Sequence, residues 1–196
     1  MFTGIIESVG TVTDLLPEGT NLTLRVRASL APELRIDQSL SHNGVCLTVT
    51  AVDGDQYSVT AVDETLRKTN LGRLAVGHRL NLERCMPANG RFDGHIVQGH
   101  VDQTALCTHV AEVGGSWLYD FQYDPTLGNL TVEKGSICIN GVSLTVFNSE
   151  DDRFRVTIIP YTYAHTTFCD LRAGDVVNLE FDIVGKYIKK MLGQYR

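Results

Sequence analysis

Two residues with reactive side chains, a histidine and a cysteine, suggest where chemistry takes place in this chain. His100 follows Gly99 on a segment that reads as a strand, and an imidazole can carry a proton near neutral pH. A strand histidine alone is more often structural. Cys46 lies in a Val-, Leu- and Thr-rich segment, where it is either a nucleophile, a polar pocket wall or a small buried hydrophobic residue.

Both residues lie within an internal duplication. Residues 39–49 read SLSHNGVCLTV and residues 136–146 read SICINGVSLTV, identical at 7 of 11 positions with an offset of 143 − 46 = 97. LAVGHRLNLE at 74–83 matches LRAGDVVNLE at 171–180 with the same offset, 174 − 77 = 97. A repeat of this length indicates two copies of one domain.

A duplicated pocket fits two copies of one ligand, or two related ligands, that face each other. Asn-Gly at 43–44 and 140–141 favours tight hairpin turns. Thr48 and Thr145 follow, where they either contact a polar ligand edge or serve as strand formers. Differences between the copies allow one ligand to be donor and the other acceptor. The differing pairs are Phe2 and Val97, Ile5 and His100, His42 and Ile139, Cys46 and Ser143, and Cys85 and Asp182.

Short apolar segments separated by turn signals predict the elements that hold these residues. In the first half they are residues 22–26, 46–52, 57–62 and 80–83. Such closely spaced strands predict an all-β fold, which we interpret as tandem duplicated small antiparallel Greek-key β-barrels. The expected domains are residues 1–94 and 95–183, with the linker Pro-Ala-Asn-Gly at 87–90.

The end of the chain changes to helical spacing. Apolar residues recur at i, i+3, i+4, i+7 and i+8, namely Val184, Tyr187, Ile188, Met191 and Leu192. This pattern predicts an amphipathic C-terminal α-helix within residues 183–195, and we assign residues 184–196 to it as an oligomerisation helix. Its apolar face either plugs the chain's own barrel or contacts another copy of the chain.

Composition excludes several function classes. The 196 residues are 43% hydrophobic and 20% charged, and 17 basic against 23 acidic residues give a net charge of −6. With no basic run, neither nucleic acid nor a membrane surface is an expected partner, and we expect a cytoplasmic protein. Five widely spaced cysteines disfavour a disulfide framework or zinc ribbon. Nicotinamide and metal chemistry are disfavoured because the sequence has no fingerprint for either.

Several of these segments together give a specific resemblance. Along essentially the whole chain, the sequence resembles the riboflavin synthase family of the alpha-chain type. The segments that carry the resemblance are Met-Phe-Thr-Gly-Ile-Ile at 1–6, His-Asn-Gly-Val-Cys-Leu-Thr-Val at 42–49, Glu-Thr-Leu-Arg at 64–67, Thr-Asn-Leu-Gly at 69–72, Gly94-His95, Gly99-His100, Asn-Gly-Val-Ser-Leu-Thr-Val at 140–146 and Val-Asn-Leu-Glu at 177–180.

The resemblance implies a transferase-type dismutase of riboflavin biosynthesis. It would take two molecules of 6,7-dimethyl-8-ribityllumazine per site, move a four-carbon unit between them, and release riboflavin and 5-amino-6-ribitylamino-pyrimidinedione. No external cofactor and no metal are implied. By analogy the protein is a homotrimer joined through the C-terminal helix, with the reacting pair held between the N-terminal barrel of one subunit and the C-terminal barrel of another.

The resemblance also implies site residues. The reactive positions are Phe2, Ser39, Cys46, His100, Thr145 and Asp182. We expect His100 with Thr145 to handle protons at one ring, and Cys46 with Ser39 to act at the other. The substrate-binding positions are Gly4, Ile5, Ile6, Cys46, Leu47, Thr48, Thr60, Ala61, Val62, Asp63, Glu64, Thr65, Gly99, His100, Val101, Lys134, Ser143, Leu144, Thr145, Thr157, Ile158, Ile159, Pro160, Tyr161 and Thr162.

The sequence departs from the family pattern at two places. Tyr-Thr-Tyr at 161–163 replaces the Glu-Thr-Leu of the first half, and Asp93 precedes Gly94 where many relatives have a second glycine.

Two rival functions remain. One rival is a non-catalytic lumazine- or flavin-binding protein of the same fold. The retained reactive positions weigh against it. The other rival is a β-barrel flavin reductase, which would depend on a nicotinamide cofactor.

Overall fold

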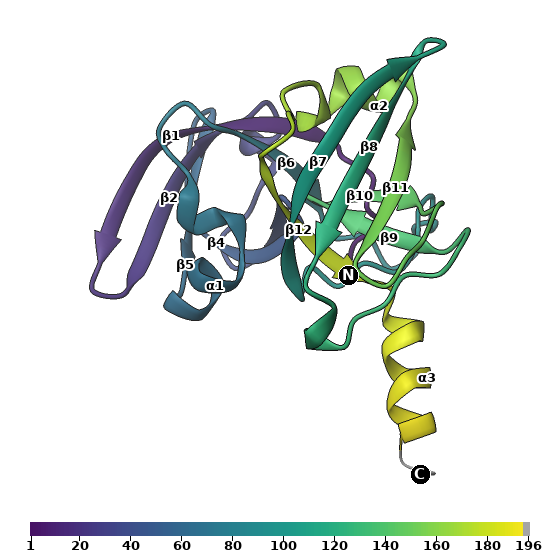
Figure 1. Cartoon of the computed structure of the whole chain (residues 1–196). Helices are drawn as coiled ribbons and strands as arrows, with labels where there is room; N and C mark the ends of the chain where they lie inside the picture. Colours follow the sequence, from purple (N-terminus) through teal and green to yellow (C-terminus); the bar gives the residue numbers. More distant parts are fainter. Residues whose placement is uncertain (194–196) are drawn as a thin grey trace.

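Each half of the chain folds into six antiparallel strands, because apolar residues alternate along them and turn residues separate them. In strand β5, Tyr57, Val59 and Ala61 are buried and alternate with partly exposed residues. In the computed structural model, which describes residues 1–193, the two halves lie side by side (Figure 1). No helix within these residues is long and apolar enough to cross a membrane.

The elements follow the same order in both halves. The first half contains β1 (Ser8–Glu18), β2 (Asn21–Arg27), η1 (Ala31–Glu33), β3 (Ser39–His42), β4 (Val45–Asp53), β5 (Gln56–Ala61), α1 (Asp63–Lys68), η2 (Asn70–Arg73) and β6 (Arg79–Arg84). The second half contains β7 (Gln103–Val113), β8 (Ser116–Tyr123), η3 (Pro125–Leu127), β9 (Ser136–Ile139), β10 (Val142–Thr145), β11 (Arg153–Ile158), α2 (Pro160–His165), η4 (Thr167–Cys169), β12 (Val176–Phe181) and the C-terminal helix α3 (Ile183–Gly193).

The strand order confirms the duplicated barrel. The first half is a closed barrel with the order β1-β2-β5-β4-β3-β6, and β2 to β5 form a Greek key within it. The second half has the equivalent neighbours, in the order β10-β9-β12-β7-β8-β11. Unlike the first barrel, the second is not fully closed by paired strands, because β10 ends at Thr145 before it pairs with β11. A single bridge between Phe147 and Arg155 joins the two edges there. Asn148 follows with a φ of 49°, which breaks the strand there.

The predicted Asn-Gly hairpins are present in both halves. Asn43 and Asn140 have φ values of 47° and 45°, and Gly44 and Gly141 have φ values of 81° and 82°. Positive φ at both central residues is the geometry of a type I′ turn, which joins β3 to β4 and β9 to β10. A Cβ atom at Gly44 would lie 2.9 Å from the Gly141 nitrogen, so the two turns also meet each other.

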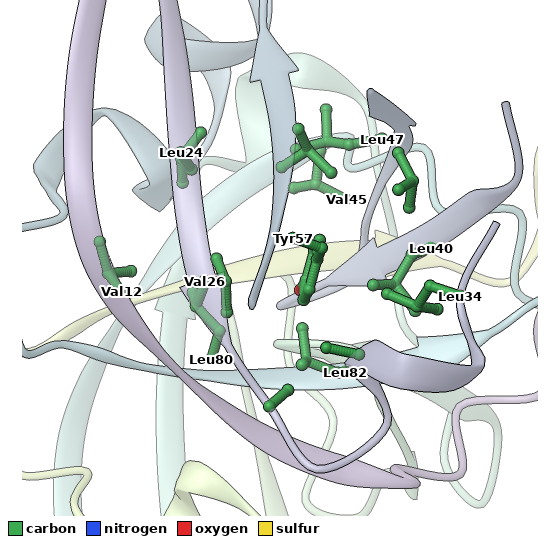
Figure 2. Packing of buried hydrophobic residues seen from close by; sticks show 14 of the residues in the cluster. Val12, Leu24, Val26, Leu34, Leu40, Val45, Leu47, Tyr57, Leu80 and Leu82 are labelled. Atoms are coloured by element: carbon green, nitrogen blue, oxygen red, sulfur yellow. The ribbon is translucent and has the colours of Figure 1, made fainter. Parts of the chain in front are cut away.

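Each barrel encloses its own hydrophobic core. Figure 2 shows Leu24, Val26, Tyr57 and Leu80 pointing into the first barrel, where all four are at most 1% exposed. The second core is more aromatic, and its fully or almost fully buried rings are Tyr119, Phe121, Phe154 and Phe168.

The structure corrects three details of the prediction. The strand predicted for residues 57–62 ends at Ala61, because Val62 is the residue that precedes helix α1. His100 is not on a strand: its segment forms a bend at Gly99, which has a φ of 82°. Helix α3 does not plug a barrel, since it points away from both (Figure 1), and its apolar residues Val184 and Leu192 are 53% and 66% exposed. Residues 194–196 of the predicted helix lie outside the described residues.

Candidate functional site

Two extended segments cross between the barrels. We call residues 2–6 the N-terminal arm and residues 97–101 the linker arm. The arms pair with each other through Phe2 and Val97, with N···O distances of 2.7 and 3.1 Å. The Gly4 carbonyl accepts a hydrogen bond from the Ser143 N–H on β10 at 2.8 Å. Thus the arm that begins the first half lies against a strand of the second barrel.

The linker arm makes the reciprocal contact with the first barrel. The Gly99 carbonyl accepts a hydrogen bond from the Cys46 N–H on β4 at 2.9 Å. Glycine is required at both crossings, since a Cβ atom at Gly4 would lie 2.6 Å from Ser143 Cβ and one at Gly99 would lie 2.6 Å from Cys46 Cβ. His100, which follows Gly99, is therefore placed beside the first barrel.

A buried glutamate holds each arm. Glu83 on β6 is 4% exposed and accepts hydrogen bonds from the Thr3 N–H at 2.6 Å, the Thr3 hydroxyl at 2.8 Å and the Gly4 N–H at 2.9 Å. Its equivalent on β12, Glu180, is 2% exposed. The Glu180 carboxylate accepts from the N–H groups of residues 98, 99 and 100 at 2.6, 2.9 and 2.8 Å. Burial raises the pKa of both carboxyl groups, and the N–H donors oppose that shift.

Buried asparagines join the barrels away from the arms. The side-chain amide of Asn81 donates to the Asn140 carbonyl at 2.9 Å, and that of Asn178 donates to the Asn43 carbonyl at 2.9 Å. The Oδ1 atoms of Asn43 and Asn140 accept from the backbone N–H groups of Asn81 and Asn178. Every partner therefore has its equivalent 97 residues away, and the network fixes a pseudo-twofold arrangement of the barrels.

In the first barrel, Cys46 lies at a corner with two other polar groups. Ser39 lies close enough to lower the pKa of the Cys46 thiol, and Cys85 lies close enough to raise it. Ser39 and Cys85 line a cleft of about 810 Å³, which Ile5 of the N-terminal arm also borders. Burial raises the pKa of the Cys46 thiol, so the thiol is protonated at neutral pH. This disfavours the nucleophile interpretation, and the half-buried Cys46 packs against Phe2, Val97 and Cys138.

The equivalent corner of the second barrel has different chemistry. Ser143 replaces Cys46, and its hydroxyl lies 2.7 Å from His95 Nδ1. Burial lowers the pKa of His95, whereas the nearby carboxylate of Asp182, the counterpart of Cys85, raises it. Ser136 and Asp182 also line a cleft of about 590 Å³ along helix α3. A neutral imidazole can accept the serine proton, so this corner offers a hydroxyl, an imidazole and a carboxylate.

His95 is a site residue that sequence reasoning missed. Gly94-His95 was visible as a motif, but the repeat has no position that matches His95 in the first half, so the comparison of halves gave it no partner. A Cβ atom at Gly94 would lie 2.1 Å from the Thr3 carbonyl oxygen and 2.8 Å from Ser143 Cβ. The glycine is therefore what lets His95 approach Ser143.

The structure regroups the predicted reactive residues. His100 lies with Cys46, because its arm contacts β4, whereas Thr145 lies on β10 opposite Ser136 and beside the N-terminal arm. Within one chain the structure does not bring His100 and Thr145 together. Phe2 is fully buried and packs with Val97 and Cys138, so its ring supports the arms from the interior. His100 and Thr145 are exposed.

The remaining predicted binding residues lie at corresponding barrel edges. Because Val49 pairs with Val59, the end of β5 runs beside the start of β4, and Thr60 lies level with Thr48. The following Val62 is 51% exposed, and its counterpart Ile159 after β11 is 57% exposed. Lys134 has a φ of 64°, and its ammonium lies 5.7 Å from the centre of the Phe147 ring. Each barrel therefore presents an exposed face of mixed polar and apolar residues.

Comparison with known proteins decides which family has this arrangement. A family model described as the lumazine binding domain matches the chain twice, at residues 3–85 and 98–182. Riboflavin synthases from Actinobacillus pleuropneumoniae and Bacillus subtilis are each 42% identical over 193 residues, which covers 98% of this chain and 90% of each relative. The chain belongs to the riboflavin synthase family. The Saccharomyces cerevisiae riboflavin synthase is 36% identical over 205 residues, with 98% of this chain and 86% of the relative covered.

Solved structures of a more distantly related protein, LumP, have the same fold. LumP complexed with 6,7-dimethyl-8-(1'-D-ribityl) lumazine superposes with a TM-score of 0.83 at 20% identity, over 92% of this chain and 99% of LumP. LumP complexed with riboflavin gives a TM-score of 0.84 at 23% identity with the same coverage. At this level of identity the likeness shows the shared fold.

Proposed function

We propose that this protein is a riboflavin synthase, which converts two molecules of 6,7-dimethyl-8-ribityllumazine to riboflavin and 5-amino-6-ribitylamino-pyrimidinedione. The observation that carries the proposal is the pair of equivalent barrel faces with unequal polar groups. Two like frames can bind two like molecules. The unequal groups then let one molecule donate the four-carbon unit and the other accept it.

Much of the chemistry belongs to the substrate. The electron-poor ring acidifies its C7 methyl group, and the resulting anion attacks the second lumazine. The protein's part is to hold the two rings in reacting geometry and to move protons. We assign proton transfer at the first barrel's ligand to His100, which lies on an exposed bend beside Cys46. The thiol of Cys46 and the hydroxyl of Ser39 line the same corner as hydrogen-bonding groups.

At the second barrel, the polar groups are Ser143, His95, Asp182 and Thr145. We assign them to orienting the second ring and accepting or returning its protons. Ser143 and His95 already share a hydrogen bond of 2.7 Å, so a proton can pass between them without rearrangement. The departures at 161–163 lie in helix α2, where Tyr161 is 69% exposed at the rim of this face.

A homotrimer is part of the proposal, because each face is open in a single chain. The first barrel of one subunit would cover the second barrel of another, so that the two lumazines meet between subunits. Helix α3 supports this arrangement: Tyr187, Ile188 and Met191 are 66%, 53% and 57% exposed, and such an apolar stripe favours association. A cytoplasmic location belongs to the same proposal, and cell fractionation tests it.

Removal of residues 184–196 should therefore give monomers with folded barrels, measured by light scattering and far-UV circular dichroism. A matched pair of full-length variants refines the test. Ile188→Ser on the apolar face should dissociate the assembly, whereas Lys190→Ser on the other face should leave it intact. An unchanged oligomer after truncation would place the subunit contact elsewhere.

The direct assay uses the purified protein and the lumazine alone, with riboflavin formation followed by fluorescence. We expect two lumazines to be consumed for each riboflavin formed, without added metal or nucleotide. Binding of the lumazine without turnover would support the non-catalytic rival, for which the fold shared with LumP is the relevant observation. A requirement for a nicotinamide cofactor would support the flavin reductase rival.

A further inference from the structure

Because the two arms cross, each buried glutamate holds an arm that contacts the opposite barrel. Glu180 belongs to β12 of the second barrel, but the linker arm that it holds lies against Cys46 of the first barrel. Glu83 belongs to β6 of the first barrel, but the N-terminal arm that it holds lies against Ser143 of the second. Beyond these contacts, Ile6 packs on the core of the second barrel and Val101 on the core of the first. Both carboxyl groups are buried, although Glu83 and Ile5 also border the cleft beside Ser39.

We propose that Glu83 and Glu180 are positioning residues that act on the pocket of the opposite barrel. Glu180 places His100 beside Cys46 of the first barrel, and Glu83 places Gly4 and Ile6 against the second barrel. This inference deepens the proposed function, since the two pockets are the proposed lumazine sites. It predicts an exchange of effects that a glutamate acting only on the stability of its own barrel would not produce.

The hydrogen bonds explain why a carboxylate is needed. Glu180 presents two oxygens to three successive N–H groups, and Glu180 Oε2 alone accepts from residues 99 and 100. A glutamine at this position has one oxygen and an NH2 group, so at least one buried N–H would face another donor. Charge-assisted hydrogen bonds are about twice as strong as neutral ones, and a buried N–H without an acceptor is costly. We therefore expect the arm to shift in Glu180→Gln.

The two arms differ in what a shift would affect. The linker arm carries His100 at the position where the N-terminal arm carries Ile5, a residue without acid or base chemistry. A displacement of about 1 Å at a catalytic group can reduce the rate about 10²-fold. Glu180→Gln should thus lower kcat about 10²-fold and also weaken ligand binding beside Cys46. Glu83→Gln should mainly raise KM, because its arm contributes binding contacts.

Two local reporters separate the pockets. The chain has one tryptophan, Trp117 on β8, which pairs with Ile158 and stacks on Tyr163 of helix α2 with 3.7 Å between ring centres. Labelling with 5-fluorotryptophan gives a single ¹⁹F resonance for the second pocket. Alkylation of half-buried Cys46 by iodoacetamide, followed by mass spectrometry of its peptide, reports on the first pocket.

The experiment first measures both reporters without ligand. In Glu180→Gln, Cys46 should be alkylated at least tenfold faster than in wild type, because Gly99 no longer covers it, while Trp117 stays unchanged. In Glu83→Gln, the Cys46 rate should stay within twofold. Riboflavin is then titrated. The riboflavin concentration that halves the alkylation rate of Cys46 should rise at least tenfold in Glu180→Gln but not in Glu83→Gln. The riboflavin concentration at the midpoint of the ¹⁹F shift of Trp117 should rise at least tenfold in Glu83→Gln but not in Glu180→Gln.

Controls distinguish the possible failures. Asn70→Thr, which introduces the residue found at position 167, removes side-chain hydrogen bonds to Asn140 and Asn178 of the other barrel without touching an arm, and both reporters should behave as in wild type. If Glu180→Gln fails to fold, Gly99→Ala displaces the same arm with the carboxylate intact and should give the same pattern. Unchanged Cys46 alkylation, or effects confined to each glutamate's own barrel, would overturn the proposal. A wild type that ignores riboflavin would overturn the proposed function and leave the ligand-free comparison valid.

Discussion

Cys46 in the first barrel and Ser143 in the second occupy equivalent positions, and their backbones make the same contact. Each N–H donates to the carbonyl of a glycine in an arm, at 2.9 and 2.8 Å. Their side chains meet different groups, since the Cys46 thiol is near Ser39 and Cys85, whereas the Ser143 hydroxyl contacts His95. The duplication thus keeps the frame in backbone contacts and places its differences in side chains.

A second difference lies inside the barrels. His42 of the first barrel is fully buried, with Nδ1 3.0 Å from the Leu40 carbonyl and Nε2 2.8 Å from the Tyr57 hydroxyl. The second barrel has Ile139 and Phe154 at the equivalent positions, 97 residues away. The same barrel therefore accepts a polar pair or an apolar pair at one place in its core, provided that both members change together.

The largest expected effect concerns the arms, in which His100 of the linker arm occupies the position equivalent to Ile5 of the N-terminal arm. His100→Gln should keep lumazine binding and lose about 10²- to 10⁴-fold in turnover, because an amide can hydrogen-bond but cannot cycle a proton near pH 7. Steady-state kinetics and ligand titration measure the two quantities separately. Ile5→Val serves as the control at the equivalent position and should change turnover little. Turnover within about threefold of wild type would make His100 a positioning residue instead.

The next prediction tests the crossing itself. Gly99→Ala should reduce the free energy of unfolding by about 3 kcal/mol, because it adds strain at a φ of 82° to a clash with Cys46. Gly4→Ala should cost about the same, since its crossing is equivalent. Gly19→Ala is the control: φ is 63° there but nothing lies within 4 Å, so about 1 kcal/mol is expected. If urea denaturation shows the same loss of unfolding free energy for Gly19→Ala and Gly99→Ala, the contact between Gly99 and Cys46 is not tightly packed.

The buried pair should make stability depend on pH in the first barrel. Burial lowers the pKa of His42 from 6.5 to about 4. Between these values the unfolded chain binds a proton that the folded chain does not, so stability falls as the pH decreases from 6.5 to 4, by about 3 kcal/mol in total. The double variant His42→Ile with Tyr57→Phe copies the second barrel and should lose this dependence. His42→Ile alone should be less stable than the double variant, because it leaves the tyrosine hydroxyl without its partner.

The smallest expected effect concerns the two thiols of the first corner. Burial raises the pKa of Cys46, whereas Cys85 is exposed. At pH 8 iodoacetamide should therefore alkylate Cys46 about tenfold more slowly than Cys85, since the thiolate is the reacting form. Mass spectrometry of the two peptides over time gives both rates. Faster reaction at Cys46 would restore the nucleophile interpretation.

Much of the fold was predictable because the sequence contains it twice. The Asn-Gly turns, the strands β2, β4 and β6, and the change to helical spacing after residue 182 are local patterns, and each was confirmed. The interpretation of residue 100 as part of a strand was wrong, because Glu180, 80 residues away, holds Gly99 in a bend. No local pattern reports a contact over that distance.

By itself, the sequence determined the two-barrel architecture and the family, because duplication, strand periodicity and motifs are encoded along the chain. Tertiary structure alone decided which of the site residues become neighbours. The arms cross, so His100 joins Cys46 rather than Thr145, and His95 joins Ser143. The physical reason is that buried N–H groups must find acceptors. The N–H groups of the arms donate to Glu83 and Glu180, and the N–H groups of Cys46 and Ser143 donate to glycine carbonyls of the arms, which requires each arm to lie against the opposite barrel.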